Sequence, residues 1–347
     1  MSLLKVEDLK VHFPIKKGIL IERTIGHVRA VDGVTLEVEP GQTYGLVGES
    51  GCGKSTLGRA ILRLNEITSG HVYFDGVDLA ALSTEDMRKS RQRLQMVFQD
   101  PMGSLDPRQC VEEILSEGLI AHGLAKGKVA RRKMLHGVLD AVGLPSTSLT
   151  RYPHEFSGGQ RQRIGIARAT VLRPDLIICD EPVSALDVSI QAQVLNLLEE
   201  IQEETGVAYI VIAHDLAVVR HIADKVGVMY LGQVVEEADS DMLYAEPAHP
   251  YTRSLMSAVP VPDPDVEDRR ERILLQGDLP SPANPPSGCR FHTRCPWAQD
   301  RCRTEVPLLR SYKAQSGQAA PHKVACHFAE DIASGTLEIQ QDKAEIV

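Results

Sequence analysis

The sequence of 347 residues lacks a long apolar segment. Its longest unbroken apolar run, residues 207–213, is much shorter than the ~20 residues that a helix needs to cross a bilayer. The N-terminal stretch carries acidic side chains early and has no apolar core, so it does not resemble a signal peptide. We therefore expect a chain that lies in the cytosol or reaches a membrane through a partner.

The sequence also lacks an excess of positive charge and any visible internal repeat. Its net charge is −9, which argues against nucleic acid as a partner. Charged residues make up 24% and hydrophobic residues 43%, as is typical of a soluble globular protein long enough for one large and one smaller domain. Cys52, Cys110 and Cys179 are scattered, and we expect them to be plain thiols.

The stretch 48–56 matches the phosphate-loop pattern G-x-x-x-x-G-K-[ST], known as Walker A. The apolar run at 42–47 predicts a buried strand before it, and the spacing of 54–64 predicts a helix after it. Glycines let backbone N–H groups turn toward anionic oxygens, and the helix N-terminus adds positive charge. Lys54 can reach the β- and γ-phosphates, and the Ser55 hydroxyl can bind Mg²⁺. The predicted nucleotide-binding residues of this loop are Gly48, Glu49, Ser50, Gly51, Cys52, Gly53, Lys54, Ser55 and Thr56.

Two acidic residues follow an apolar run at 176–179, which predicts a central parallel strand with carboxylates at its C-terminal end. Ligands bind at that end in open α/β sheets. Asp180 fits a residue that holds Mg²⁺, and Glu181 fits a general base. A second buried strand is predicted at 207–213 and is followed by His214. We expect His214 to contact the γ-phosphate; a purely structural histidine is the alternative.

Three further positions are candidates for the same site. Gln99 ends a predicted strand at 93–99. Ser157 is a good N-cap, and the two glycines after it leave backbone N–H groups open to an anion. Phe13 ends a predicted strand at 3–13 and either stacks on a nucleotide base or fills a sheet edge.

The remaining pattern predicts a second N-terminal strand at 27–38, reached through a loop at 14–26. Further short strands are predicted at 70–75, 225–230 and 233–237. The clearest helical segments are 111–121, 128–142 and 188–204.

Together these motifs resemble the signature set of ATP-binding-cassette (ABC) ATPases, over residues 1 to about 240. The matching positions are 48–55 (Walker A), Gln99 (Q-loop), Ser157, Gly158, Gly159 and Gln160 (signature), 176–181 (Walker B and its glutamate), 184–187 with Asp187 (D-loop) and His214 (H-loop). The resemblance implies an α/β P-loop NTPase cassette at 1–258, with a RecA-like core, an antiparallel β subdomain and a helical subdomain at about 100–172.

The same resemblance implies a role for each of these residues. Ser55, Gln99 and Asp180 would hold Mg²⁺ or its water, and Glu181 and His214 would be catalytic. The signature residues would cap ATP held by a second ATPase subunit, and Asp187 would also be a nucleotide-binding residue.

Four segments narrow the resemblance to the ATPase subunits of bacterial oligopeptide/dipeptide importers, closest to the second, F-type subunit: 97–101, 151–157, 249–252 and 279–289. This implies ATP hydrolysis that powers peptide import, by a peripheral subunit on the cytoplasmic face of the inner membrane. It also implies a heterodimer with a homologous ATPase, two transmembrane permeases, an indirect peptide-binding protein and no nucleic acid. The alternatives are an importer for another small solute such as nickel, or a soluble ABC ATPase outside transport.

Beyond residue 258 the chain becomes rich in proline, and we predict an irregular C-terminal extension at 259–347. Its cysteines Cys289, Cys295, Cys302 and Cys326 are spaced C-x5-C-x6-C-x23-C. Four thiolates suit Zn²⁺ or an iron–sulfur cluster, and free thiols are the alternative. The resemblance favours a [4Fe–4S] cluster over zinc. We expect a structural role, because no catalytic group lies nearby in the sequence.

Overall fold

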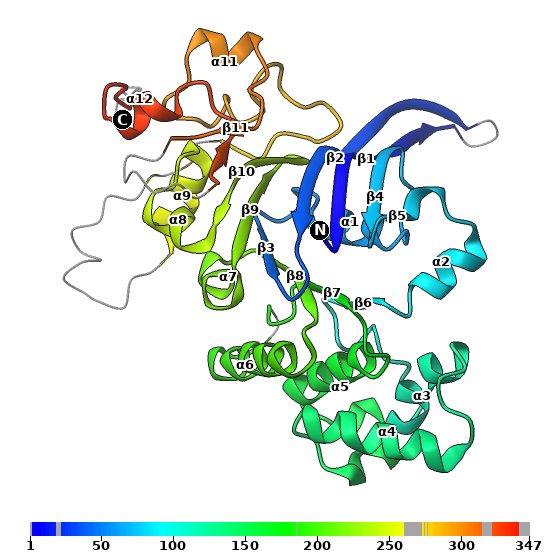
Figure 1. Cartoon of the computed structure of the whole chain (residues 1–347). Coiled ribbons are helices and arrows are strands. Elements are labelled where there is room, and N and C mark those ends of the chain that lie inside the picture. Colours follow the sequence, from blue (N-terminus) through cyan, green and yellow to red (C-terminus); the bar gives the residue numbers. More distant parts are fainter. Residues whose placement is uncertain are drawn as a thin grey trace.

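The strands form two separate sheets in the computed structural model, which describes residues 2–18, 22–184, 186–259, 273, 275, 277–313 and 321–339 (Figure 1). The larger sheet has eight strands in the order β11-β12-β10-β9-β3-β8-β7-β6. Their bounds are β3 (Thr43–Val47), β6 (Leu94–Val97), β7 (Leu176–Asp180), β8 (Ala208–Ala213), β9 (Lys225–Tyr230), β10 (Gln233–Asp239), β11 (Arg310–Ser311) and β12 (Lys323–Val324).

The centre of this sheet is parallel and buried. Strands β9, β3, β8, β7 and β6 pair in parallel, and every residue of β3, β7 and β8 is buried. Continuous apolar runs form such strands because both sheet faces are covered. The register pairs Val47 with Ala213 and Asp180 with Ile212. The predicted buried strands are therefore confirmed, and their C-terminal ends meet at one edge.

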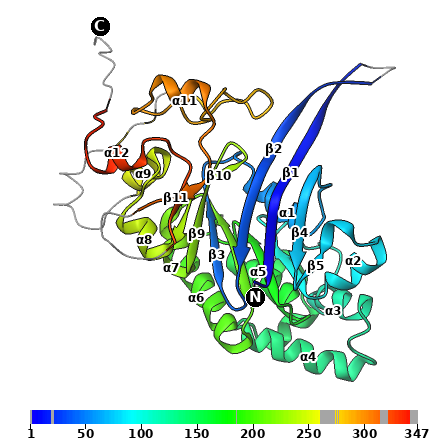
Figure 2. The same ribbon diagram turned by 45° about the horizontal axis from the view of Figure 1, so that its top comes forward.

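The smaller sheet is antiparallel, in the order β2-β1-β4-β5. Its bounds are β1 (Leu4–Lys17), β2 (Arg23–Val38), β4 (Ser69–Phe74) and β5 (Val77–Asp78). The predicted loop at 14–26 is wrong, because β1 and β2 continue pairing through Ile15–Gly26 to Lys17–Arg23. This part of the hairpin is a largely exposed ribbon (Figure 2), so it needs no apolar alternation and left no strand signal.

Helices α3 to α5 come between β6 and β7 in the sequence. They form a bundle inside the predicted helical subdomain. Leu115, Leu119, Leu135 and Leu139 are fully buried in its core. The bounds of the helices up to residue 258 are α1 (Lys54–Ile61), α2 (Thr84–Ser90), α3 (Val111–Ala121), α4 (Lys128–Ala141), α5 (Gly158–Thr170), α6 (Val188–Thr205), α7 (Leu216–Ile222), α8 (Ser240–Ala245) and α9 (Pro250–Ala258). Within the described ranges, no helix is long and apolar enough to span a bilayer.

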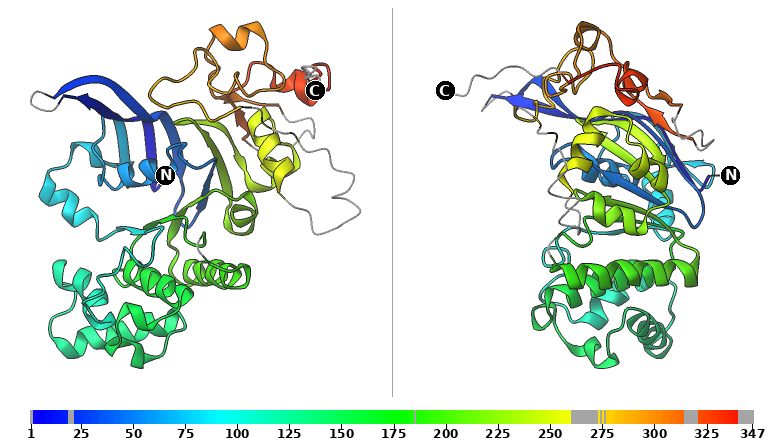
Figure 3. Two further views of the ribbon diagram at one scale, coloured as in Figure 1. Left: turned by 180° about the vertical axis from the view of Figure 1, so that it is seen from behind. Right: turned by 90° about the vertical axis from the view of Figure 1, so that its left-hand side faces the viewer.

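The C-terminal extension lies at the end of the molecule opposite the helical bundle (Figure 3). It contains helices α11 (Asp300–Thr304) and α12 (Ala329–Ala333). Strand β12 pairs with β10, and β11 pairs with β12, both antiparallel. The extension is therefore not wholly irregular as predicted: it lengthens the main sheet at its β10 edge.

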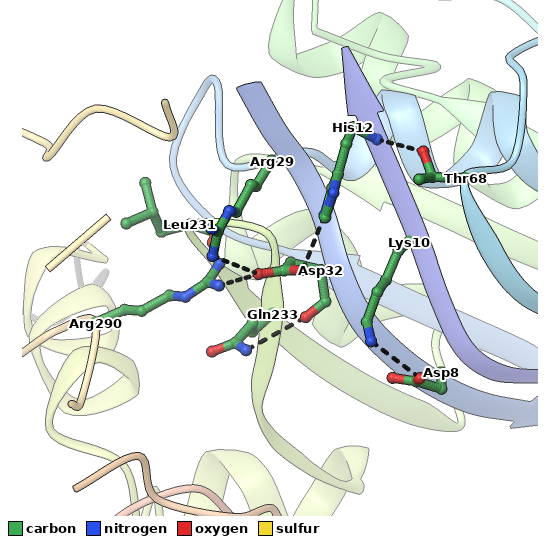
Figure 4. Close-up of polar contacts among 9 residues, drawn as sticks. All are labelled: Asp8, Lys10, His12, Arg29, Asp32, Thr68, Leu231, Gln233 and Arg290. Atoms are coloured by element: carbon green, nitrogen blue, oxygen red, sulfur yellow. Dashed lines mark hydrogen bonds and ion pairs between the residues drawn. The ribbon is translucent and has the colours of Figure 1, made fainter. Parts of the chain in front are cut away.

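An arginine of the extension also binds the N-terminal hairpin (Figure 4). Arg290 pairs with the Asp32 carboxylate of β2 and donates to the Leu231 carbonyl oxygen at 2.5 Å. His12 Nε2 of β1 lies 2.9 Å from the other Asp32 oxygen. Burial raises the Asp32 pKa, but the hydrogen bonds from Arg290 and His12 leave it below its ordinary value. The extension is thus fastened to both sheets.

Candidate nucleotide-binding site

The phosphate loop joins β3 to α1, as predicted, and two of its glycines are required by close backbone approach. Gly48 has φ 153°, and a Cβ there would lie 2.1 Å from the Met229 carbonyl oxygen. Gly53 has φ 108°, and a Cβ there would lie 2.0 Å from the Ala30 carbonyl oxygen. Any larger side chain would push the loop away from β9 and β2. The glycines therefore set the loop conformation.

Lys54 lies inside this loop. Its side chain is buried, and its Nζ donates to the Gly48 carbonyl oxygen at 2.6 Å and to the Glu49 carbonyl oxygen at 3.0 Å. The ammonium group is thereby held at the N-terminal end of α1, where the helix dipole also favours an anion. This arrangement suits a phosphate ligand.

Ser55 and Asp180 come together at the start of α1 and the end of β7. The Ser55 hydroxyl donates to Asp180 Oδ1 at 2.7 Å. Asp180 is fully buried, and its Oδ2 has no hydrogen-bond partner within the described chain, although Arg59 lies 3.8 Å away. Burial raises the pKa of this carboxyl. A hydroxyl beside a buried carboxylate with a free oxygen fits a hard cation such as Mg²⁺.

Glu181, Gln99 and His214 form a second cluster beside the first. Gln99 Nε2 donates to Glu181 Oε2 at 3.1 Å, and His214 Nδ1 lies 3.4 Å from the same oxygen. Glu181 has φ 47°, an uncommon value for a non-glycine residue, and its N–H donates to Ile212 O at 2.9 Å. It borders a cavity of about 50 Å³ that His214 also lines. The fold thus assembles the predicted base with its predicted partners.

The predicted signature residues form the exposed N-terminus of α5. The Ser157 hydroxyl accepts from the Gln160 N–H at 3.4 Å, and Gln160 Oε1 accepts from the Ser157 N–H at 3.1 Å. This capping box confirms Ser157 as the N-cap. Gly159 is needed for packing, since a Cβ there would lie 2.6 Å from Ile190 Cγ2 of α6. No hydrogen bond or ion pair of the described residues joins this helix start to the phosphate loop.

Two candidates remain, Asp187 and Phe13. Asp187 is the N-cap residue of α6, whereas Ala185 of the same predicted loop lies outside the described residues. Phe13 lies in β1 opposite Val28 and is 40% exposed. Its role in base stacking stays a prediction.

Two residues that contact the phosphate loop were missed by the sequence analysis. The Tyr251 hydroxyl of α9 accepts from the Glu49 N–H at 2.7 Å. Arg294 of the C-terminal extension pairs with the Glu49 carboxylate at 2.7 and 3.0 Å. Nothing in their local sequence indicates the loop. The extension therefore contacts the phosphate loop, although Arg294 and Glu49 are 245 residues apart in the sequence.

The cysteines of the extension line one small cavity, together with Phe291 and Trp297. Its cysteine members are Cys289, Cys295, Cys302 and Cys326. All four are free thiols, and burial raises the pKa of Cys289 to about 11 and of Cys326 to about 12. In the part of the chain that the structure describes, no three or more His, Cys, Asp or Glu side chains are arranged as metal ligands. The fold gathers the thiols without forming a metal-binding geometry.

Comparisons with known protein families identify two regions. The model of the ABC transporter family matches residues 31–184, and that of the oligopeptide/dipeptide transporter C-terminal region matches residues 235–302. The chain is 53% identical over 328 residues to the putative oligopeptide transport ATP-binding protein YkfD of Bacillus subtilis, covering 94% of this chain and 96% of that one. It is 52% identical over 325 residues to the oligopeptide transport ATP-binding protein OppF of Escherichia coli, with coverages of 93% and 95%.

Solved structures agree with this fold. The cbiO1 subunit of Clostridium perfringens, part of the ABC transporter complex cbiONQ, is 28% identical with a TM-score of 0.61, over 71% of this chain and 91% of that one. The cassette MJ0796, solved as a dimer in a post-hydrolysis state with ADP and Pi, is 28% identical with a TM-score of 0.60, over 68% and 98%.

Proposed function

The chain belongs to the ABC family of oligopeptide-transport ATPases, and from this membership we propose that it is the ATP-hydrolysing subunit that powers the import of peptides. The observation that carries the proposal is the meeting of the phosphate loop with Asp180, Glu181 and His214 at one edge of the main sheet. A triphosphate with its magnesium ion fits a glycine loop, a buried carboxylate and a neighbouring base.

In this proposal the loop residues bind the nucleotide. Lys54 and backbone N–H groups of the loop would hold the phosphates, while Ser55, Asp180 and Gln99 would hold Mg²⁺ or its water. When bound, Mg²⁺ supplies charge neutralisation for the β- and γ-phosphates. Asp180 Oδ2 supports this assignment, because this buried oxygen accepts no hydrogen bond among the described residues and its charged neighbour Arg59 stays 3.8 Å away.

Glu181 then acts as the general base. Its carboxylate accepts a proton from the attacking water, while Gln99 and His214 keep it oriented from two sides. His214 is also proposed to donate a hydrogen bond to the γ-phosphate. This arrangement supports hydrolysis as well as binding.

The signature residues act on a second subunit. Ser157, Gly158 and Gln160 are exposed and make no described contact with the loop of their own chain. We propose that they cap ATP held by a homologous ATPase in a heterodimer, with Asp187 at the same interface. The pair would dock on two permeases at the cytoplasmic face of the inner membrane and serve a peptide-binding protein on the other side.

We propose that the chain divides into an ATP-binding domain at 1–258 and a C-terminal extension at 259–347 that packs against it. Four thiols lining one cavity are the type of donor that a [4Fe–4S] cluster or Zn²⁺ takes, although the described residues are not arranged as metal ligands. We favour the cluster, in a structural role. Protein purified without oxygen is then expected to be brown, with iron and acid-labile sulfide at about four each per chain. Stoichiometric zinc would place the site in the zinc class, and neither metal would leave free thiols.

The transport function is tested by reconstitution. Proteoliposomes that contain this subunit, its partner ATPase and the permeases are expected to take up labelled oligopeptides only with ATP and the binding protein. ATP hydrolysis without any peptide-dependent uptake would contradict the proposed cargo while leaving the ATPase assignment intact.

A further inference from the structure

A charged contact joins the C-terminal extension to the phosphate loop. Arg294 Nη1 and Nη2 donate to the two carboxylate oxygens of Glu49 at 2.7 and 3.0 Å. The Arg294 side chain is 9% exposed and that of Glu49 is 28% exposed. A two-pronged pair of this kind fixes the orientation of both side chains, and its low exposure limits screening by solvent.

The surroundings of this pair hold it in place. The Tyr251 hydroxyl accepts the Glu49 N–H, and the Tyr251 ring lies 4.8 Å from that of Tyr230 and 5.4 Å from that of Phe291. Phe291 belongs to the extension and is 1% exposed. The extension and α9 thus pack against Glu49. Residues outside the loop therefore set the position of the Glu49 side chain.

The negative charge of Glu49 is unfavourable for phosphate binding unless a positive charge pairs with it. The loop holds Lys54 and the open N-terminus of α1 for an anionic ligand, yet its own second residue is an acid. An unpaired carboxylate beside the bound phosphates would repel them, since like charges a few ångströms apart interact strongly near a protein surface. Arg294 is the guanidinium that neutralises this carboxylate.

We propose that Arg294 is a positioning residue for ATP binding, which neutralises and orients Glu49 so that the phosphate loop accepts the nucleotide. The inference rests on the proposed ATPase function and adds to it a requirement for the C-terminal extension. ATP affinity then depends on a residue far from the cassette motifs and next to Cys295 of the four-cysteine cavity.

The test compares charge-neutralising single and double variants of the full-length subunit. Arg294→Gln is expected to weaken ATP binding roughly tenfold, because it leaves the Glu49 charge unpaired. The double variant Glu49→Gln/Arg294→Gln is expected to recover wild-type affinity within about threefold, because it removes the charge as well. Arg294→Lys should lie between these, since it keeps the charge and loses the fork. Lys323→Gln is the matched control: it removes another extension-to-sheet ion pair, with Glu237, away from the loop.

Binding of a fluorescent ATP analogue would be measured at low and at high salt, with thermal unfolding to confirm the fold. The loss in Arg294→Gln should shrink at high salt and should raise KM for ATP more than it lowers kcat. Unchanged affinity in Arg294→Gln, or a double variant as weak as the single, would overturn the proposal. If Arg294→Gln does not fold, the double variant and Arg294→Lys decide by the same criteria. Failure of the wild-type chain to bind ATP would instead refute the proposed function.

Discussion

Replacement of Glu181 by glutamine tests the centre of the proposed mechanism. The substitution keeps the size of the side chain and removes its basicity. The amide oxygen can still accept the hydrogen bond that Gln99 Nε2 gives at 3.1 Å, and no backbone change is needed at φ 47°. Glu181→Gln is therefore expected to fold normally and to bind ATP with nearly wild-type affinity.

The magnitude follows from the role of the carboxylate. A positioned general base contributes about 10²–10⁴-fold to rate, which is about 2.7–5.4 kcal/mol of transition-state stabilisation. His214 lies 3.4 Å from the same oxygen, but its contact with an amide cannot replace the base. We expect hydrolysis in the reconstituted complex to fall by that factor, and the ATP-bound state to persist.

The assay is steady-state phosphate release by the complex, with nucleotide binding measured in parallel. Glu199→Gln is a matched control, since it makes the same chemical change on the exposed face of α6, where Glu199 has only a weak contact with His221 at 3.8 Å. The control should keep full activity. Near-normal turnover in Glu181→Gln would refute the assignment of the base.

Three other predictions concern separate parts of the molecule. Gly158→Asp is expected to abolish the closed ATP-bound dimer, measured by gel filtration, while the lone subunit still binds ATP. This variant is a cleaner test than Gly159→Asp, because a Cβ at Gly158 would meet only Leu186, at 3.6 Å. A Cβ at Gly159 would lie 2.6 Å from Ile190. Loss of ATP binding in the lone subunit would contradict the action across the interface. Cys295→Ser is expected to remove most of the iron from anaerobically purified protein, measured by metal analysis, and retained iron would exclude this thiol as a ligand. Burial lowers the pKa of His249 to about 4 from about 6.5, so its neutral form stabilises the fold fully above pH 6.5. Acidification from pH 7 to pH 4 should lower the free energy of unfolding by about 3 kcal/mol, seen as a falling midpoint of chemical unfolding. His249→Gln should reduce this dependence of stability on pH.

The sequence by itself determined the nucleotide loop and the strand ends around it. Gly48, Lys54 and Ser55 act through backbone conformation and a helix start, which are local properties of one short segment. The apolar runs before Asp180 and His214 likewise predict buried parallel strands, and parallel strands end at one edge whatever their order. The residues of the site could therefore be predicted without knowledge of the strand order.

The sequence was less informative where structure depends on distant partners. The hairpin extension beyond Phe13 is an exposed ribbon held by backbone pairing, so its polar residues gave no periodic signal. The strands of the extension are two residues each, and they exist only because β10 offers an edge for pairing. No local pattern predicts such strands.

Only the tertiary structure decided that the C-terminal extension contacts the nucleotide loop. Arg294 and Glu49 are each ordinary charged residues in their own segments, and contacts of α9 and of the hairpin accompany their pairing. An ion pair is specified by position in space, whereas a phosphate loop is specified by consecutive residues. For that reason the sequence identified the ATP site, whereas only the fold showed that Arg294 pairs with Glu49 of that site.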